Sequence, residues 1–302
     1  MPSKSSNQAP PPGPVARFFR GAFRPGVLLL AAIAAAGWFL GPTIRRALPP
    51  IEERDEYRIR AAEIQVPDMP TWIPEDFVAE ATRRAGLREE LSLLDEGLTA
   101  DVAEAFRLHP WVRNVVRVEK SYPARVVARL EFREPVAMVQ VQGGMYPIDA
   151  HGVLLPPTDF SAAETHRYPA IAGVKSTPQG PAGSSWGDPI VIAAAKVAVA
   201  LLSEWRELGL VAIRVVEPAK RKPEEMTFEL VAPQGSRIVW GRPPGTDHPG
   251  ELSADQKLGR LKDYRARFGD FDAPQGPYEI DIRHWQEISR RPLAERDTPN
   301  RR

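Results

Sequence analysis

Alternating apolar and charged residues along residues 125–133 predict a half-buried β-strand. The even positions are apolar (Val126, Ala128, Leu130, Phe132), and most odd positions are charged (Arg125, Arg129, Glu131, Arg133). A repeat of two places successive side chains on opposite faces of a strand. The surrounding stretch, residues 109–156, combines a helix end, two strands and an Asp-x-x-Gly turn without a catalytic group in a suitable setting. This pattern favours a binding module over an enzyme.

Residues 61–138 are expected to form a small α+β unit. The predicted elements, in order, are a strand at Ala61–Val66, a helix from Pro74 to Gly86, a helix with Thr99 as its N-cap that ends at Pro110, and strands at about 111–119 and 124–133. The helical spacing of apolar residues, together with the capping residues, predicts the two helices. The order strand, helix, helix, strand, strand predicts a sheet covered on one face by two helices.

Residues 139–290 are expected to form a second, β-rich unit with two helices. The predicted elements are a meander of Val139–Val141, Met145–Ile148 and Val153–Leu155, a helix from Asp188-Pro189 to Leu208, strands at about 211–217, 226–232 and 236–240, a helix at about 253–268, and a closing strand at Tyr278–Ile282. Proline at the first helical position, directly after an aspartate N-cap, is a strong start for the first of these helices.

Residues 26–44 are uncharged and mostly apolar, which predicts a single transmembrane helix of about 20 residues. A cleaved signal peptide is one rival, since Ala34-Ala35-Ala36 resembles a cleavage site, and a buried core helix is another. Apolar residues continue to Leu40, so the sequence favours an uncleaved anchor. Arginines also follow the segment, so the flanking charges do not fix its orientation. Long domains are translocated largely regardless of charge, which favours an N-terminal tail on the cytoplasmic side.

Composition narrows the function classes. The chain has no cysteine, which excludes thiolate metal sites, a cysteine nucleophile and disulfides. The net charge is +1; residues 1–26 hold +4, which leaves −3 for residues 45–302. The slightly acidic net charge of residues 45–302 argues against nucleic-acid binding. Asp149 and His151 could form an acid/base pair, but a turn aspartate that caps backbone amides is the favoured interpretation.

Several ordered motifs resemble a known family. They are His109-Pro110-Trp111-Val112, Val116-Arg117-Val118, Tyr122-Pro123, Arg133-Glu134-Pro135-Val136-Ala137, Tyr146-x-Ile148-Asp149-x-x-Gly152, Val239-Trp240-Gly241-Arg242, Lys257-Leu258-Gly259-Arg260-Leu261 and Asp281-Ile282-Arg283. Together they resemble the FtsQ/DivIB family of bacterial cell-division proteins, and the order of elements in residues 61–138 looks like a POTRA domain. The glycine that usually follows the first POTRA strand is missing here, and Pro67–Pro74 takes its place.

The resemblance implies a bitopic scaffold of the division machinery in the cell inner membrane, with a cytoplasmic N-terminus and extracytoplasmic domains. The corresponding layout is a basic tail (1–25), a transmembrane helix (26–44), a charged linker (45–60), a POTRA-like domain (61–138), an FtsQ-type β domain (139–290) and a flexible tail (291–302). The implied partners are other bitopic division membrane proteins, similar to FtsB or FtsL. No enzymatic activity, cofactor, metal, nucleic acid or small-molecule substrate is implied.

The expected mechanism is β-augmentation, in which a partner segment pairs with the exposed edge of the last strand. The resemblance implies that the closing strand region binds the partner. The six residues at the matching positions are Tyr278, Glu279, Ile280, Asp281, Ile282 and Arg283. Alternation predicts that Ile280 and Ile282 point inward, and both could simply belong to the core. The alternative function is a POTRA-bearing envelope chaperone or transport accessory protein. An envelope enzyme is a third, disfavoured option.

Overall fold

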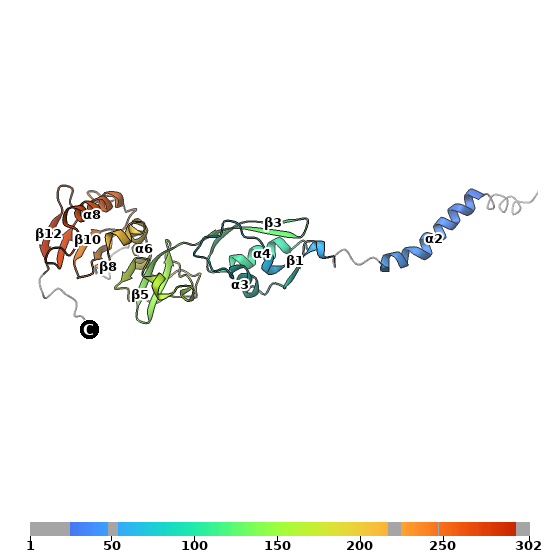
Figure 1. Cartoon of the computed structure of the whole chain (residues 1–302), viewed down its shortest axis with the longest axis horizontal. Coiled ribbons are helices and arrows are strands. Elements are labelled where there is room, and N and C mark those ends of the chain that lie inside the picture. Colours follow the sequence, from blue (N-terminus) through green and yellow to red (C-terminus); the bar gives the residue numbers. More distant parts are fainter. Residues whose placement is uncertain (1–24, 48–53, 217–224, 247, 294–302) are drawn as a thin grey trace, which may run out of the picture. The chain divides into compact units, whose positions relative to one another are not determined.

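A computed structural model of the chain describes residues 25–47, 54–216, 225–246 and 248–293 (Figure 1). The chain divides into two compact units, residues 1–58 and residues 59–302. Within the first unit, α2 spans Pro25–Ala47 and η2 spans Asp55–Tyr57. Nearly all of the expected N-terminal tail, and the C-terminal tail beyond residue 293, lie outside the described residues.

The prediction of a transmembrane helix at residues 26–44 is wrong. Across the described ranges, no helix is both long enough and apolar enough to cross a membrane. The prediction rested on the length and the uncharged, mostly apolar character of residues 26–44. The predicted inner-membrane location of the chain is withdrawn with the helix.

The first part of the larger unit contains the two helices and the two long strands expected there. The helices are α3 (Phe77–Arg84) and α4 (Leu98–Arg107), and the strands are β3 (Val112–Ser121) and β4 (Arg125–Phe132), paired antiparallel. Val126 and Ala128 of β4 are fully buried, as their alternation predicts. Phe77 of α3 and Phe106 of α4 are also fully buried, and their rings stack with centroids 5.7 Å apart.

The start of this part differs from the prediction. Ala61–Glu63 forms a 3-10 turn (η3) instead of a strand, and only Gln65 bridges to β4, at Val127. A two-stranded sheet of β1 (Arg58–Arg60) and β2 (Glu90–Ser92) was not expected. Thr99 is not the N-cap of α4, because the helix already starts at Leu98.

The second part is built on a mixed sheet of eight strands in the order β12-β11-β10-β9-β8-β7-β5-β6. The strands are β5 (Pro135–Val141), β6 (Gly144–Asp149), β7 (Ala170–Ala172), β8 (Ala212–Val216), β9 (Thr227–Val231), β10 (Arg237–Gly241), β11 (Tyr278–Asp281) and β12 (Ser289–Pro292). The pairs β5–β7, β7–β8 and β10–β11 are parallel, and the other neighbours are antiparallel. The third strand of the expected meander, at residues 153–155, makes only isolated bridges, to Ile148 and Ser185.

Helices pack against this sheet. The helical elements are η4 (Pro157–Asp159), α5 (Ala162–Thr165), α6 (Pro189–Leu201), α7 (Trp205–Leu208) and α8 (Ala254–Phe268). The α6 helix contacts β5, β8 and α8, and its start at Asp188-Pro189 is confirmed, with the Asp188 carboxylate accepting the Ile190 amide at 2.8 Å. The expected single helix to Leu208 is instead divided into α6 and α7. A core that includes Trp186, Phe228 and Trp240 lies between these layers.

Candidate docking edge of the sheet

The six nominated residues lie on β11 and directly after it. Ile280 and Ile282 are fully buried, which confirms that they point inward. The prediction that this strand is the exposed edge is wrong, because β11 pairs with β10 on one side and with β12 on the other. The edge of the sheet at this end is therefore β12 (Ser289–Pro292), whose residues were expected to belong in part to the β domain (to 290) and in part to the flexible tail (from 291). Tyr278 is also buried, and Glu279 and Asp281 are half-buried.

The register of β12 fixes which of its backbone groups face away from the sheet. The Leu293 amide donates to the Pro277 carbonyl at 2.9 Å, so this pair is of the hydrogen-bonded type. Hydrogen-bonded pairs alternate with non-hydrogen-bonded pairs in an antiparallel ladder, which makes the pairs 278·292 and 280·290 non-hydrogen-bonded. Arg290 therefore directs its N–H and C=O outward from the edge, while Pro292 offers only a carbonyl there.

Side chains on both faces hold β12 in place. On one face, the Arg290 guanidinium lies 4.8 Å from the ring centroid of Tyr278 and 4.8 Å from that of Phe268 in α8. On the other face, Arg291 pairs with Glu279 at 2.6 Å between nitrogen and oxygen. A cation over an aromatic face is stabilised by the ring quadrupole. The edge strand is thus fixed to both β11 and α8, although all four of its residues are exposed.

A second clamp acts on the turn that leads from β11 to β12. Arg260 of α8 donates from its two terminal nitrogens to the carbonyls of Trp285, at 2.8 Å, and of Glu287, at 3.1 Å. The Trp285 side chain itself is 64% exposed. Helix α8 therefore positions both the turn and the edge strand that follows it.

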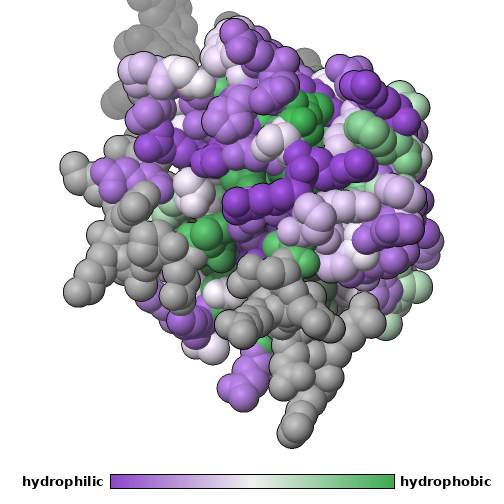
Figure 2. Space-filling view, turned by 90° about the vertical axis from the view of Figure 1, so that its left-hand side faces the viewer, coloured by the Kyte–Doolittle hydropathy of each residue, from purple (hydrophilic) through white to green (hydrophobic). Residues whose placement is uncertain are grey.

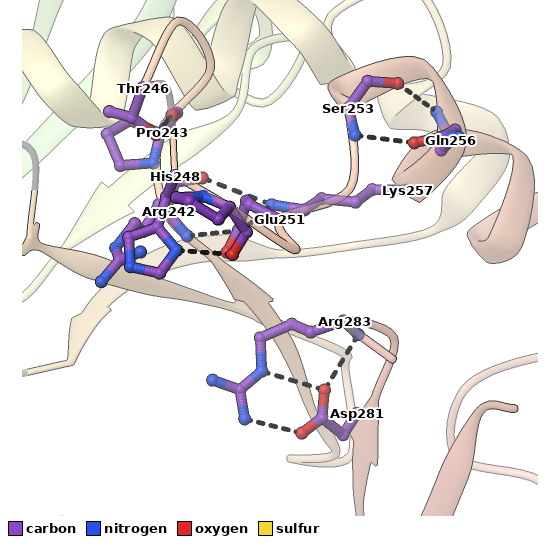
Figure 3. A network of polar contacts seen from close by, with 11 residues as sticks. Arg242, Pro243, Thr246, His248, Glu251, Ser253, Gln256, Lys257, Asp281 and Arg283 are labelled. Atoms are coloured by element: carbon purple, nitrogen blue, oxygen red, sulfur yellow. Dashed lines mark hydrogen bonds and ion pairs between the residues drawn. The ribbon is translucent and has the colours of Figure 1, made fainter. Parts of the chain in front are cut away.

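The end of β11 carries a bidentate ion pair (Figure 3). The Asp281 carboxylate accepts from Nε of Arg283 at 3.0 Å, from its terminal nitrogen at 2.7 Å, and from its backbone amide at 2.9 Å. Burial alone would raise the pKa of Asp281, but these hydrogen bonds and the positive charge of Arg283 outweigh it and hold the pKa below its ordinary value. This pair fixes the chain as it leaves β11.

A buried lysine anchors the start of α8 (Figure 3). Lys257 is 2% exposed, forms an ion pair with Glu251, and lies 5.1 Å from the ring centroid of Trp240. Glu251 also accepts the backbone amide of Arg242 at 3.1 Å. Burial lowers the pKa of Lys257, and the contact with Glu251 opposes that shift. These residues border a pocket of about 430 Å³ between the start of α8 and the loop after β10.

Figure 2 views the end of the molecule that carries β12, β10 and α8 in Figure 1. Hydrophilic residues cover most of this face, and hydrophobic residues appear between them in small, separate patches. Broad apolar patches mark interfaces driven by hydrophobic burial. The coloured part of this face therefore shows only small apolar patches.

The suggestion of catalysis at Asp149 and His151 finds no support in the geometry. One carboxylate oxygen of Asp149 accepts the backbone amides of His151, at 2.8 Å, and of Val153, at 2.9 Å. The other oxygen accepts from Arg133 at 2.8 Å. Asp149 is therefore the turn-capping aspartate that the sequence favoured. Comparison with known protein families and with characterised proteins finds no match to this chain.

Proposed function

We propose that this chain is a docking protein without enzymatic activity, and that it receives an extended segment of a partner protein as an added strand on β12. The observation that carries the proposal is the outward-facing backbone of Arg290 at the edge of an eight-stranded sheet. Main-chain hydrogen bonds to such an edge supply affinity, and side chains that alternate along it supply selectivity.

The fixed position of β12 supports this proposal. An edge strand that must order itself on binding loses conformational freedom at that moment, which weakens binding. Here the Arg290 contacts with two rings and the Arg260 clamp on the preceding turn hold the strand before a partner arrives. Pro292 and the two arginines limit unspecific pairing, since proline and charge on an edge strand oppose aggregation.

The resemblance to the FtsQ/DivIB family supports bacterial cell division as the setting, with partners of the division machinery. The experiment is a fluorescent fusion combined with depletion of the chain in its own organism. Recruitment to mid-cell and filamentous growth after depletion are expected. An even distribution of the fusion together with normal division would contradict the assignment to cell division, and would leave the chaperone or transport alternative as the setting for the same edge.

A further inference from the structure

The segment Pro110-Trp111 joins the first part of the large unit to the second. Trp111 is fully buried, and its indole Nε1 donates to the Asp159 carboxylate of η4 at 2.8 Å. Its ring centroid lies 5.9 Å from that of Phe160. Trp111 directly precedes β3, whereas Asp159 and Phe160 follow β6 along the chain, so one side chain connects the two parts.

The backbone of this segment also approaches the second part closely. A Cβ at Gly183 would lie 3.3 Å from the Cα of Pro110, and the φ angle of Gly183 is +95°. Both the tight contact and the positive φ favour glycine at this position. The junction is therefore closely fitted at Pro110 as well as hydrogen-bonded at Trp111.

His109 directly precedes this segment and contacts the backbone of Trp111. Its ring is 3% exposed, and its Nδ1 accepts the backbone amide of Trp111 at 3.3 Å. The ring meets the edge of Phe77 in α3 with centroids 4.7 Å apart. Among the described residues its Nε2 has no hydrogen-bond partner, and the nearest carboxylate oxygen, on Glu80, is 3.7 Å away.

The charged groups around His109 affect how readily its ring is protonated. Glu80 and Arg84 face it from α3, and Asp159 faces it from η4. Burial lowers the pKa of His109 below its ordinary value; Arg84 adds to this, while the carboxylates of Glu80 and Asp159 act against it without reversing it. A state with His109 exposed would have an ordinary histidine pKa, so acid favours that state.

We propose that His109 is a proton-sensitive latch on the junction. Protonation turns Nδ1 from an acceptor into a donor, which breaks the hydrogen bond from the Trp111 amide. Trp111 is then released from Asp159, and the contact between β3 and the η4 segment loosens. The latch is independent of the docking edge, because it uses different residues at a different end of the sheet.

The test uses the full chain labelled uniformly with ¹⁵N. The indole signal of Trp111 is assigned through a Trp111→Phe variant, and its exchange protection is measured near pH 7.5 and near pH 5.5. As the pH falls, the exchange protection of the indole and of the Asp159 and Phe160 amides is expected to decrease. Between the ordinary pKa of an exposed histidine and the lower pKa of buried His109, the decrease is at most about tenfold for each pH unit. Unchanged protection would overturn the latch.

The His109→Asn variant separates the latch from general acid effects. Asparagine places an acceptor near the position of Nδ1 but does not titrate, so protection at Trp111 should stay high near pH 5.5. His248→Asn, in an exposed loop after β10, is the matched control and should behave like the unchanged chain. If the His109→Asn chain does not fold, the His109 ring is titrated directly by NMR in the unchanged chain; a pKa at or above the ordinary value would overturn the proposal.

Discussion

The guanidinium of Arg290 lies 4.8 Å from the ring centroid of Tyr278, which is its diagonal neighbour in the β11–β12 pair, where Arg290 itself lies opposite Ile280. This contact places a charged residue of the sheet edge over a buried ring of the neighbouring strand. The backbone N–H and C=O of Arg290 point outward, because Arg290 and Ile280 form a non-hydrogen-bonded pair. One residue therefore both holds the edge strand and presents its pairing groups.

Arg260→Ala should loosen the turn before β12 without unfolding the sheet. The variant loses two hydrogen bonds to the carbonyls of Trp285 and Glu287, and since both sites are exposed the expected loss of stability is about 1 kcal/mol. Hydrogen exchange should become faster at residues 285–293 and stay unchanged in β8 and β9. Arg260→Lys, which can reach only one carbonyl at a time, should be intermediate. Unchanged exchange at residues 285–293 would show that Arg260 does not clamp the turn.

Acid should weaken the end of β11 through Asp281. The folded pKa of Asp281 lies below its ordinary value of 3.8, so its pair with Arg283 stabilises the fold fully above the unfolded pKa. That contribution decreases as the pH falls below the unfolded value and is gone below the folded one. Urea unfolding should therefore show a gap between the unchanged chain and Asp281→Asn that is constant near neutral pH and closes in acid. A gap that widens in acid would contradict this sign.

Lys257→Met should be among the most destabilising single changes in the second part. It leaves Glu251 without its ammonium partner in a largely buried position, and breaking a buried pair in this way costs about 3 kcal/mol or more. The double variant Lys257→Met with Glu251→Gln removes the stranded charge, while the glutamine oxygen can still accept the Arg242 amide. Chemical denaturation should show that the double variant regains more than half of the loss. Additive losses would show that the two residues are not coupled.

Local signals in the sequence predicted the elements that depend on local chemistry. The Asp188-Pro189 helix start and the inward direction of Ile280 and Ile282 follow from capping and alternation, and the structure has both. The same applies to the buried alternate positions Val126 and Ala128 of β4. In each case the deciding interactions lie within a few residues along the chain.

The features that were not predicted from the sequence depend on contacts between residues that are far apart along the chain. Strand β12 has no alternation to detect, because every residue of Ser289–Pro292 is exposed. It is held by rings at Phe268 and Tyr278 and by pairing with β11. The short strand β7 is likewise fixed by its neighbours β5 and β8. The edge of the sheet was therefore predicted one strand too early.

The most direct test of the docking edge compares Arg290→Pro with Arg290→Ala in the full chain. Both variants lose the guanidinium, but only proline removes the outward N–H, and proline is tolerated on an edge strand whose N–H faces solvent. Division proteins that co-purify with the chain from its own cells are quantified, with unfolding midpoints as the control for folding. Recovery of the partner is expected to be about tenfold lower with proline than with alanine, because proline removes one backbone hydrogen bond. Equal recovery from two equally folded variants would contradict strand addition at β12.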